Sequence, residues 1–461
     1  MSSKKVVIVG GGAAGGTAAQ FARKADREAQ IAVLSREEHG QYSRCGLVYA
    51  LSGVVESFDS LIEFGPGWFQ ERGIDYRTGV SATIIEPNSR RIDVLKGHNT
   101  ENIFYDSLVI ATGGVPKIPE IDGIHTTEGS AKDGIFVLRT LEDGKHIKER
   151  GATAKSAVIA GAGMIGVEAA DALRHLGLNV TIVEAEGSVL PTMLDPDVAE
   201  TVELRMRELG IVVKTGALVS SVNGARGVES VRVKRVADGA TAEINCDMLV
   251  LAVGTAPAAK LAGSAGCAIG ATGGIVIDDR CSTSVQNIFA AGDCSEYRDF
   301  ITGVPSLCGM GHIAVQQGRV AGINAVGGDA RLLPGLVTTR GISLPDMEVS
   351  ATGPTTDQLK AAGIDVMASR VAVDDRVPYF PNSKLAVKLI ARADGHALVG
   401  AQLVGSRGAH LRAAACAIAV AKGMRAEELA RIEMCYLPPA APPLDPLNVA
   451  AEFLAKRLEK R

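Results

Sequence analysis

Cys45 is the side chain in this sequence best suited to redox chemistry. It lies in the run Tyr42-Ser43-Arg44-Cys45-Gly46-Leu47, downstream of a glycine-rich turn that begins at Gly10. The next cysteine along the chain is Cys246, so no second thiol stands close enough in sequence to form an internal dithiol. A lone thiolate can attack an external disulfide, or it can be oxidised to a sulfenic acid. The spacing therefore predicts one working cysteine whose partner is an external sulfur or oxygen species.

The residues before Cys45 favour its thiolate form. Ser43 is suited to cap a helix that begins at Cys45, which would place the sulfur over unpaired backbone amides. Arg44 adds a positive charge beside the sulfur. Both effects lower the pKa of a thiol. We therefore expect the pKa of Cys45 to lie below its ordinary value.

Composition and charge exclude several classes of function. The 461 residues carry a formal net charge of -4 and are 46% hydrophobic, as in a globular protein with an ample core. Without a Lys/Arg run, a nucleic-acid partner is not expected. Because glycines interrupt the apolar N-terminus and no segment has the roughly 20 apolar residues of a bilayer span, we expect neither a signal peptide nor a membrane span. The scattered cysteines predict no metal site and a reducing, cytoplasmic setting.

A glycine fingerprint occurs twice, each time between a β-branched run and an alanine-rich helical pattern. The first glycine of such a turn permits a tight bend, the second lets the backbone approach a pyrophosphate, and the third lets helix and strand pack closely. Two copies therefore predict two bound dinucleotides. The candidate contacts are Gly10, Gly12, Ala14 and Gly15 in the first copy, and Gly161, Gly163, Ile165 and Gly166 in the second.

A group that binds the adenosine ribose is expected roughly 20 residues after each fingerprint. In the second copy the strand 180–183 ends on Glu184. A carboxylate there accepts hydrogen bonds from ribose hydroxyls and repels a 2′-phosphate, which predicts NADH in preference to NADPH. In the first copy the corresponding strand ends on Ser35 and Arg36, which are the candidate contacts there.

The rest of the chain divides into further strand and helix patterns. Segments 105–113, 247–254 and 288–293 are strands that end at glycine turns. After about residue 335 the pattern changes to strands at 385–390 and 398–404 and helical stretches at 411–421 and 426–432. The fold class that follows is α/β, with two Rossmann-like dinucleotide-binding domains and a C-terminal α+β domain.

These motifs together make the chain similar to the FAD-dependent pyridine nucleotide-disulfide oxidoreductases. It resembles most their single-cysteine branch of coenzyme A disulfide reductases, persulfide reductases and NADH oxidases. The resemblance implies FAD and NADH as cofactors. It also implies an FAD-binding domain over 1–120 and 255–330, an NAD(P)H-binding domain over 121–254, and a dimerisation domain over 335–461, with active sites shared between two subunits.

The same resemblance assigns roles to particular residues. The first fingerprint binds FAD, the segment Ala111, Thr112 and Gly113 closes over it, and Gly292 with Asp293 reaches its ribityl chain. The second fingerprint, with Glu184 and Gly254, binds the nicotinamide cofactor. Glu168 is implied to lie near the nicotinamide ring.

Tyr379 and Tyr436 resemble the tyrosines of coenzyme A disulfide reductases that reach the partner subunit's cysteine. A phenol stays protonated at neutral pH and can protonate a leaving thiolate; the alternative is that both rings pack under the dimer interface. Thr17, Arg23, Lys24 and Arg44 are candidates to hold the phosphates of coenzyme A. An ordinary solvated helix end accounts equally well for Arg23 and Lys24.

The function that follows is transfer of two electrons from NADH through FAD to a disulfide, persulfide or polysulfide at Cys45, with coenzyme A disulfide as the first candidate. One alternative is an NADH oxidase or peroxidase working through a Cys45 sulfenic acid. Against it, Ala13 stands where that subgroup has a histidine. A second alternative is an electron-transfer subunit that passes electrons to a protein. A dithiol reductase is excluded because Ala50 occupies the place of a resolving cysteine.

Overall fold

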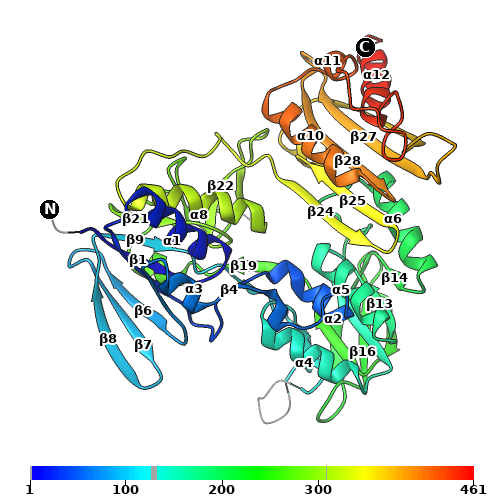
Figure 1. Ribbon diagram of the computed structural model, residues 1–461. Helices are drawn as coiled ribbons and strands as arrows, with labels where there is room; N and C mark the ends of the chain where they lie inside the picture. Colours follow the sequence, from blue (N-terminus) through cyan, green and yellow to red (C-terminus); the bar gives the residue numbers. More distant parts are fainter. Residues whose placement is uncertain (1–2, 126–131, 308, 461) are drawn as a thin grey trace.

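The computed structural model describes residues 3–125, 132–307 and 309–460. Its strands form three five-stranded sheets and several smaller ones. In Figure 1 the first sheet lies on the left, the second at the lower right, and the third above the second. This arrangement confirms the predicted α/β class with a C-terminal α+β part. In the part of the chain that the model describes, no helix is both long and apolar enough to cross a membrane.

The first sheet is parallel and has the order β21-β9-β1-β2-β5. Helices lie beside it, and its central strands β1 and β9 are nearly continuous buried apolar runs, as expected for a parallel sheet covered on its faces. Its last strand comes from far along the sequence, after the whole second sheet. The bounds are β1 (Lys5–Val9), β2 (Gln30–Leu34), β5 (Ile74–Arg77), β9 (Ser107–Ile110), β21 (Ile288–Ala290), α1 (Ala13–Ala25), α3 (Pro66–Gln70), α7 (Lys260–Ser264) and α8 (Gly311–Ala325). Smaller sheets beside it are β6 (Ser81–Glu86), β7 (Arg91–Lys96) and β8 (Asn99–Phe104), and β20 (Ile275–Val276), β22 (Ser295–Arg298) and β23 (Pro305–Leu307).

The second sheet repeats this plan with the order β11-β18-β12-β13-β14. A short antiparallel pair, β10 (Gly114–Pro116) with β19 (Thr255–Pro257), carries the chain between the two sheets in both directions. The bounds are β11 (Ile135–Val137), β12 (Ser156–Ala160), β13 (Asn179–Val183), β14 (Val212–Lys214), β18 (Met248–Leu251), α4 (Leu141–Gly151), α5 (Met164–His175) and α6 (Pro196–Glu208), with the meander β15 (Ala217–Asn223), β16 (Ser230–Arg235) and β17 (Thr241–Asn245). The domain limits given above stay a prediction.

The third sheet is antiparallel, in the order β24-β25-β28-β27-β26. Helices α10 and α12 share a buried apolar cluster with it. The bounds are β24 (Thr339–Leu344), β25 (Met347–Thr352), β26 (Val366–Asp374), β27 (Lys384–Arg392), β28 (Leu398–Gly405), α9 (Thr356–Ala361), α10 (Ala409–Ala421), α11 (Ala426–Leu429) and α12 (Pro446–Leu458). The predicted strands and helices are present, although the helix predicted over 426–432 is a single turn. Helix α12 was missed, although Asp445 caps it and Pro446 begins it, a helix-start pattern.

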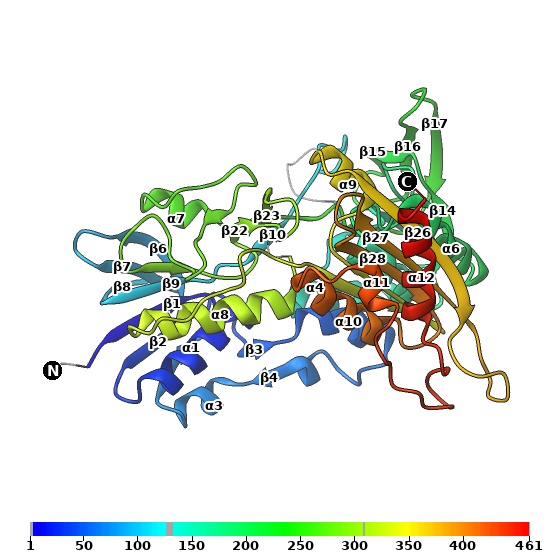
Figure 2. The same cartoon turned by 90° about the horizontal axis from the view of Figure 1, so that it is seen from above.

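Helices α1 and α8 lie side by side in Figure 2, in backbone contact. Gly318 and Gly322, one turn apart on α8, face the carbonyl oxygens of Ala14 and Ala18 on α1. A Cβ atom at either glycine would clash with that backbone. The absence of side chains at these two positions therefore sets how closely α8 approaches the helix that follows the first glycine turn.

Gly322→Ala tests this packing. We expect the added methyl group to lower the free energy of unfolding by about 1–3 kcal/mol, because it meets a backbone carbonyl that cannot rotate away. The steric cost outweighs the better helix propensity of alanine, about 1 kcal/mol. Gln316→Ala, on the exposed side of the same helix, is the control and should change stability little. Urea unfolding measures both; equal stabilities for the two variants would contradict the packing argument.

Candidate active site

Cys45 lies in a single 3₁₀ turn, η1 (Arg44–Gly46), which leads directly into the short helix α2 (Leu47–Ser52). The buried residues of α2 belong to the same apolar cluster as those of β12 and α5 in the second sheet's domain. The cysteine thus follows the first sheet's strands in sequence but is fixed against the second (Figure 1). The strands β3 (Gln41–Tyr42) and β4 (Ile62–Phe64) flank this segment and pair with each other. The 3₁₀ turn η2 (Asp59–Leu61) lies directly before β4.

The sulfur of Cys45 lies at the junction of several elements. A Cβ atom on Gly311, the first residue of α8, would be 3.9 Å from Cys45 Sγ. The charges of Glu168 on α5, of Asp293 after β21 and of Arg139 before α4 all act on the thiol. Cys45 is exposed in the single chain. The site is therefore open to an external reactant and surrounded by residues from both nucleotide-type domains.

The expected lowering of the Cys45 pKa is wrong for this structure. The Ser43 side chain caps neither η1 nor α2, which begins only at Leu47. Although Cys45 is exposed as a residue, the surrounding chain shields its sulfur in part from solvent, and this desolvation is the largest effect and raises the pKa of the thiol. The carboxylates of Glu168 and Asp293 raise it further, and Arg139 opposes them.

Arg44 does not act as the neighbouring cation that the sequence suggested. Its guanidinium forms an ion pair with Glu37 and donates to Tyr42 Oη at 2.7 Å and to the carbonyl oxygen of Arg139 at 2.7 Å. Arg139 in turn pairs with Asp293 at 2.8 Å. Arg44 thus fastens the cysteine-bearing segment to Arg139, two residues before α4. No sequence pattern points to Arg139, because its partners lie far away along the chain.

Glu168 is half-buried on α5. Burial is the dominant effect on its carboxyl group and raises the pKa of Glu168 to about 7, whereas the Tyr49 hydroxyl and the backbone of Ser343 on β24 lower it. The carboxyl group therefore titrates near neutral pH, close to Cys45.

Both glycine turns have the shape that a dinucleotide needs. Gly10 and Gly161 have φ values of 109° and 102°, which favour glycine. Around Gly12 and Gly163 a Cβ atom would meet nothing within 4 Å, so the space in front of each turn is open. Gly15 and Gly166, in contrast, lie against the carbonyl oxygens of Gly10 and Gly161. A pyrophosphate fits at each helix start.

The ends of the second strands differ between the two turns. Glu184 is buried, and its carboxylate accepts from the backbone N–H of Ala162 at 2.6 Å and of Glu186 at 2.9 Å. This holds the carboxylate beside the second turn, where a ribose would lie. In the first copy Ser35 is buried and Arg36 is exposed at the same structural position.

The other predicted cofactor contacts are divided between the two turns. Gly10 lies against Ala111, and Thr112 Oγ1 donates to the carbonyl oxygen of Ala258 at 2.7 Å. The backbone N–H of Gly292 donates to Gln317 at 2.8 Å, which fixes the position of Asp293. The remaining contacts are Ala14, buried on α1 beside Gly292; Gly113, with a φ of 71°; Ile165, exposed on α5; and Gly254, with a φ of 95°.

The predicted phosphate-binding residues on α1 have structural partners. Arg23 donates to the carbonyl oxygens of Arg72 at 3.1 Å and Gly73 at 2.7 Å, among others. Lys24 lies over the ring of Phe21, with 4.5 Å between its Nζ and the ring centroid. Thr17 is buried. Of the two interpretations of Arg23, a structural role at the helix end therefore explains its contacts better than phosphate binding does.

Tyr379 and Tyr436 meet on the surface of the C-terminal domain. Their hydroxyl oxygens are 3.2 Å apart, and the two residues are 69% and 48% exposed. Each stands in a loop, and Arg376 Nη1, which donates to the carbonyl oxygen of Pro439 at 3.3 Å, joins the two loops. The hydrogen bond to Tyr436 raises the pKa of Tyr379. The sequence predicted both residues but not their contact.

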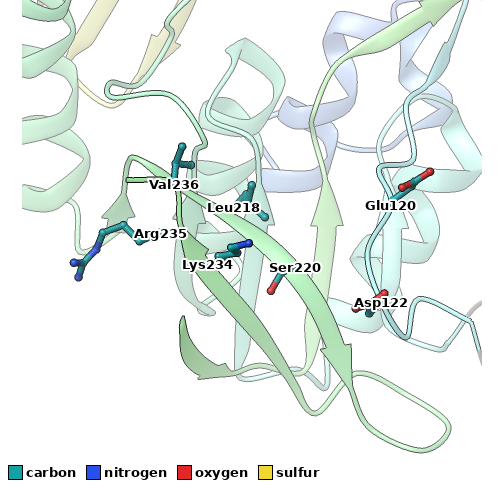
Figure 3. Close-up of a pocket in the computed structure, with 7 residues that line it drawn as sticks. All are labelled: Glu120, Asp122, Leu218, Ser220, Lys234, Arg235 and Val236. Atoms are coloured by element: carbon teal, nitrogen blue, oxygen red, sulfur yellow. The ribbon is translucent and has the colours of Figure 1, made fainter. Parts of the chain in front are cut away.

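Two open cavities lie outside the candidate active site. One, of about 390 Å³, borders the outer surface of β15 and β16 (Figure 3). Figure 3 shows the Arg235 side chain pointing away from Glu120 and Asp122. The other, of about 810 Å³, borders α10 and the loop that contains Cys435. Neither is lined by a residue predicted here to bind a cofactor or substrate.

Comparison with known proteins agrees with this geometry. An NADH oxidase from Methanocaldococcus jannaschii is 37% identical over 96% of this chain and 97% of its own. An NAD(P)H coenzyme A polysulfide/persulfide reductase from Pyrococcus horikoshii is 30% identical over 98% of both chains. The solved structure of an NAD-dependent persulfide reductase from A. fulgidus superposes with a TM-score of 0.93 at 33% identity, covering 99% of this chain and 84% of that one.

Two family models cover most of the sequence. Residues 4–318 match the pyridine nucleotide-disulphide oxidoreductase model, and residues 341–445 match the dimerisation domain of the same family. The chain therefore belongs to the pyridine nucleotide-disulphide oxidoreductases, flavoproteins that use FAD and NAD(P)H.

Proposed function

We propose that this protein is an FAD-dependent NADH:sulfur oxidoreductase that reduces a disulfide, persulfide or polysulfide through Cys45. The observation that carries the proposal is the exposed Cys45 at the junction of the two nucleotide-type domains, directly before a helix that joins the second domain's core. Of the cysteines that the structure describes, the only other exposed one is Cys435, on the C-terminal domain. The names of the Pyrococcus horikoshii and A. fulgidus relatives support a sulfur substrate. A coenzyme A derivative is the first candidate, and the cytoplasm the expected setting.

The chain's own residues account for the exchange step. The Cys45 thiolate attacks one sulfur of an external disulfide RS–SR, forming Cys45–S–SR and releasing RS⁻. A tyrosine hydroxyl then gives RS⁻ its proton, forming RSH. When bound, FAD supplies the two-electron transfer between NADH and sulfur that closes the cycle. Tyr379 and Tyr436 are exposed and hydrogen-bonded to one another, which suits them to serve the partner subunit's site in a homodimer.

The oxidase is the second candidate, and the name of the Methanocaldococcus jannaschii relative favours it. In that reaction Cys45 would cycle between thiolate and sulfenic acid. Ala13, the first residue of α1, offers no imidazole for proton transfer at the first turn. The adduct carried by Cys45 distinguishes the candidates: a thiol or sulfur atoms for the reductase, one oxygen for the oxidase. Intact mass spectrometry of the unreduced protein measures it.

Cys45→Ser tests the central role of the thiol. We expect turnover of NADH with disulfide or polysulfide acceptors to fall about a thousandfold or more, since serine cannot form the mixed disulfide. Reduction of ferricyanide by NADH should be retained, because it needs only the flavin. Cys435→Ser is the matched control and should keep full activity. Unchanged turnover of Cys45→Ser with every sulfur acceptor would favour the electron-transfer alternative.

Mixed dimers test whether the tyrosines act across the subunit interface. Homodimers of Cys45→Ser, and of the Tyr379→Phe/Tyr436→Phe double variant, should each lose most of their disulfide reductase activity, the second by about a hundredfold. A heterodimer of the two, purified with different tags, combines one intact cysteine with one intact tyrosine pair from the other subunit. We expect it to recover about half of the wild-type activity per dimer. An inactive heterodimer would place both groups in one subunit's site.

Glu184→Ala tests the preference for NADH. Loss of a buried carboxylate that binds ribose hydroxyls should raise the KM for NADH at least about tenfold, the size of a lost charged hydrogen bond. The kcat/KM for NADPH should stay level or rise, because the repulsion of its 2′-phosphate is removed. Glu186→Ala, at an exposed neighbouring position, is the control. A wild-type enzyme that prefers NADPH would contradict the assignment.

A further inference from the structure

The loop 185–194 joins Glu184, at the end of β13, to helix α6. It contacts the second glycine turn directly, since the backbone N–H of Leu190 donates to the carbonyl oxygen of Ala162 at 2.8 Å. The N–H of the same Ala162 donates to the Glu184 carboxylate at 2.6 Å. Both polar groups of this turn residue are therefore held by Glu184 and the loop that follows it, so the position of the loop affects the shape of the turn.

The loop holds Leu190 in a backbone conformation that its side chain disfavours. Its φ of 52° lies in the left-handed region, where a bulky residue is rare. Such a conformation persists only where the surrounding structure imposes it. Leu190 is buried with Val189, Met193 and Leu194 in an apolar cluster that also contains residues of β24, β25 and β28. Part of the support for this loop therefore comes from the C-terminal domain.

A buried ion cluster fixes the far end of the loop to the same domain. The Nζ atom of Lys388, on β27, is 2.8 Å from Oδ2 of Asp195 and 2.6 Å from Oδ1 of Asp197. Oδ1 of Asp195 accepts from the backbone N–H of Thr356 at 2.9 Å. The Asp195 N–H donates to Oε1 of Gln402 at 2.9 Å. Asp195 and Lys388 are both buried, so the charge of each depends on the other for compensation.

We propose that Lys388 is a positioning residue for NADH: by pairing with Asp195 it holds the loop 185–194, and with it the second glycine turn, in the geometry that binds the cofactor. The C-terminal domain thereby supports the nucleotide site of its own subunit, in addition to the dimerisation for which its family model is named. Lys388 touches neither cofactor nor substrate; it acts through Asp195. The inference rests on the proposed assignment of NADH to the second turn, but not on the acceptor that Cys45 reduces.

Removing one charge of this pair differs from removing both. Lys388→Met leaves the Asp195 carboxylate buried without its cation, so the end of the loop must move towards water. Asp197 is affected less, because its side chain is 46% exposed. In the double variant Lys388→Met/Asp195→Asn both charges of the pair are gone, and the asparagine oxygen can still accept from the N–H of Thr356. The double variant should therefore hold the loop where the wild type does.

The experiment measures cofactor binding and loop protection without turnover. Calorimetric titration of the FAD-loaded enzyme uses the 1,4,5,6-tetrahydro analogue of NADH, which cannot give up a hydride. Lys388→Met should bind this analogue about tenfold more weakly, the size of one misplaced charged hydrogen bond. Amide hydrogen exchange of the peptide that spans 185–195, followed by mass spectrometry, should be about tenfold faster. In the double variant both quantities should return to within about twofold of the wild type.

Lys384→Met is the matched control. Lys384 also lies on β27, but its ion pair with Asp374, at 2.8 Å, has side chains that are 66% and 46% exposed. Loss of such a pair should change neither binding nor exchange. Flavin content and melting temperature establish that each variant is folded. Should Lys388→Met be too unstable to purify, the milder Asp195→Asn, in which Lys388 keeps Asp197, should weaken binding in the same direction.

Two results would overturn the proposal: wild-type affinity in Lys388→Met, or in Asp195→Asn where that variant replaces it, and a double variant as impaired as the single one. The first would separate the ion pair from cofactor binding, and the second would show that the pairing of charges is not the cause. Failure of the proposed function is recognised separately. If Glu184→Ala bound the analogue as the wild type does, the assignment of NADH to this turn would fail, while hydrogen exchange still decided whether Lys388 holds the loop.

Discussion

The contact on which the site depends is the burial of helix α2 against α5. Its apolar residues leave the first sheet's domain and join the core of the second, each contributing about 1.5–3 kcal/mol on burial. Cys45 stands immediately before this helix, so its position is set by packing rather than by its own contacts. Arg44 adds a polar fastening to the carbonyl oxygen of Arg139 on the second domain's side. Neither nucleotide-type domain alone would present the sulfur; their junction does.

The two glycine turns have the same backbone geometry, one for each of the two nucleotides. Each begins with a glycine at positive φ and ends with a glycine pressed against the first glycine's carbonyl oxygen, while the middle glycine faces open space. The turns differ where the second strand ends. Glu184 is locked there by two backbone amides, whereas Ser35 offers a neutral hydroxyl. The two turns therefore differ in the residue that ends the second strand of each copy.

Local patterns were sufficient to predict the α/β class, the strands beside the two glycine turns and the turns themselves, because each is written in consecutive residues. The misjudged features depend on contacts between distant segments. Ser43 and Arg44 were expected to stabilise a thiolate, but α2 begins two residues after Cys45, and Arg44 finds its partners on Glu37 and across the chain at Arg139. Arg139 carried no sequence signal at all, since its contacts with Arg44 and Asp293 arise only when folding brings distant segments together.

In the proposed reaction a single thiol must both lose its proton and attack sulfur. Burial, Glu168 and Asp293 raise the pKa of Cys45, which favours the thiol and slows its attack on sulfur. Glu168, whose pKa is raised to about 7 and whose charge acts on this thiol, is our candidate to accept the proton at neutral pH. The leaving thiolate needs a proton in the same cycle, and the hydrogen-bonded tyrosine pair, with the pKa of Tyr379 raised, stays available as a donor. An acceptor within the subunit and a donor from the partner would together replace the second thiol that this chain lacks.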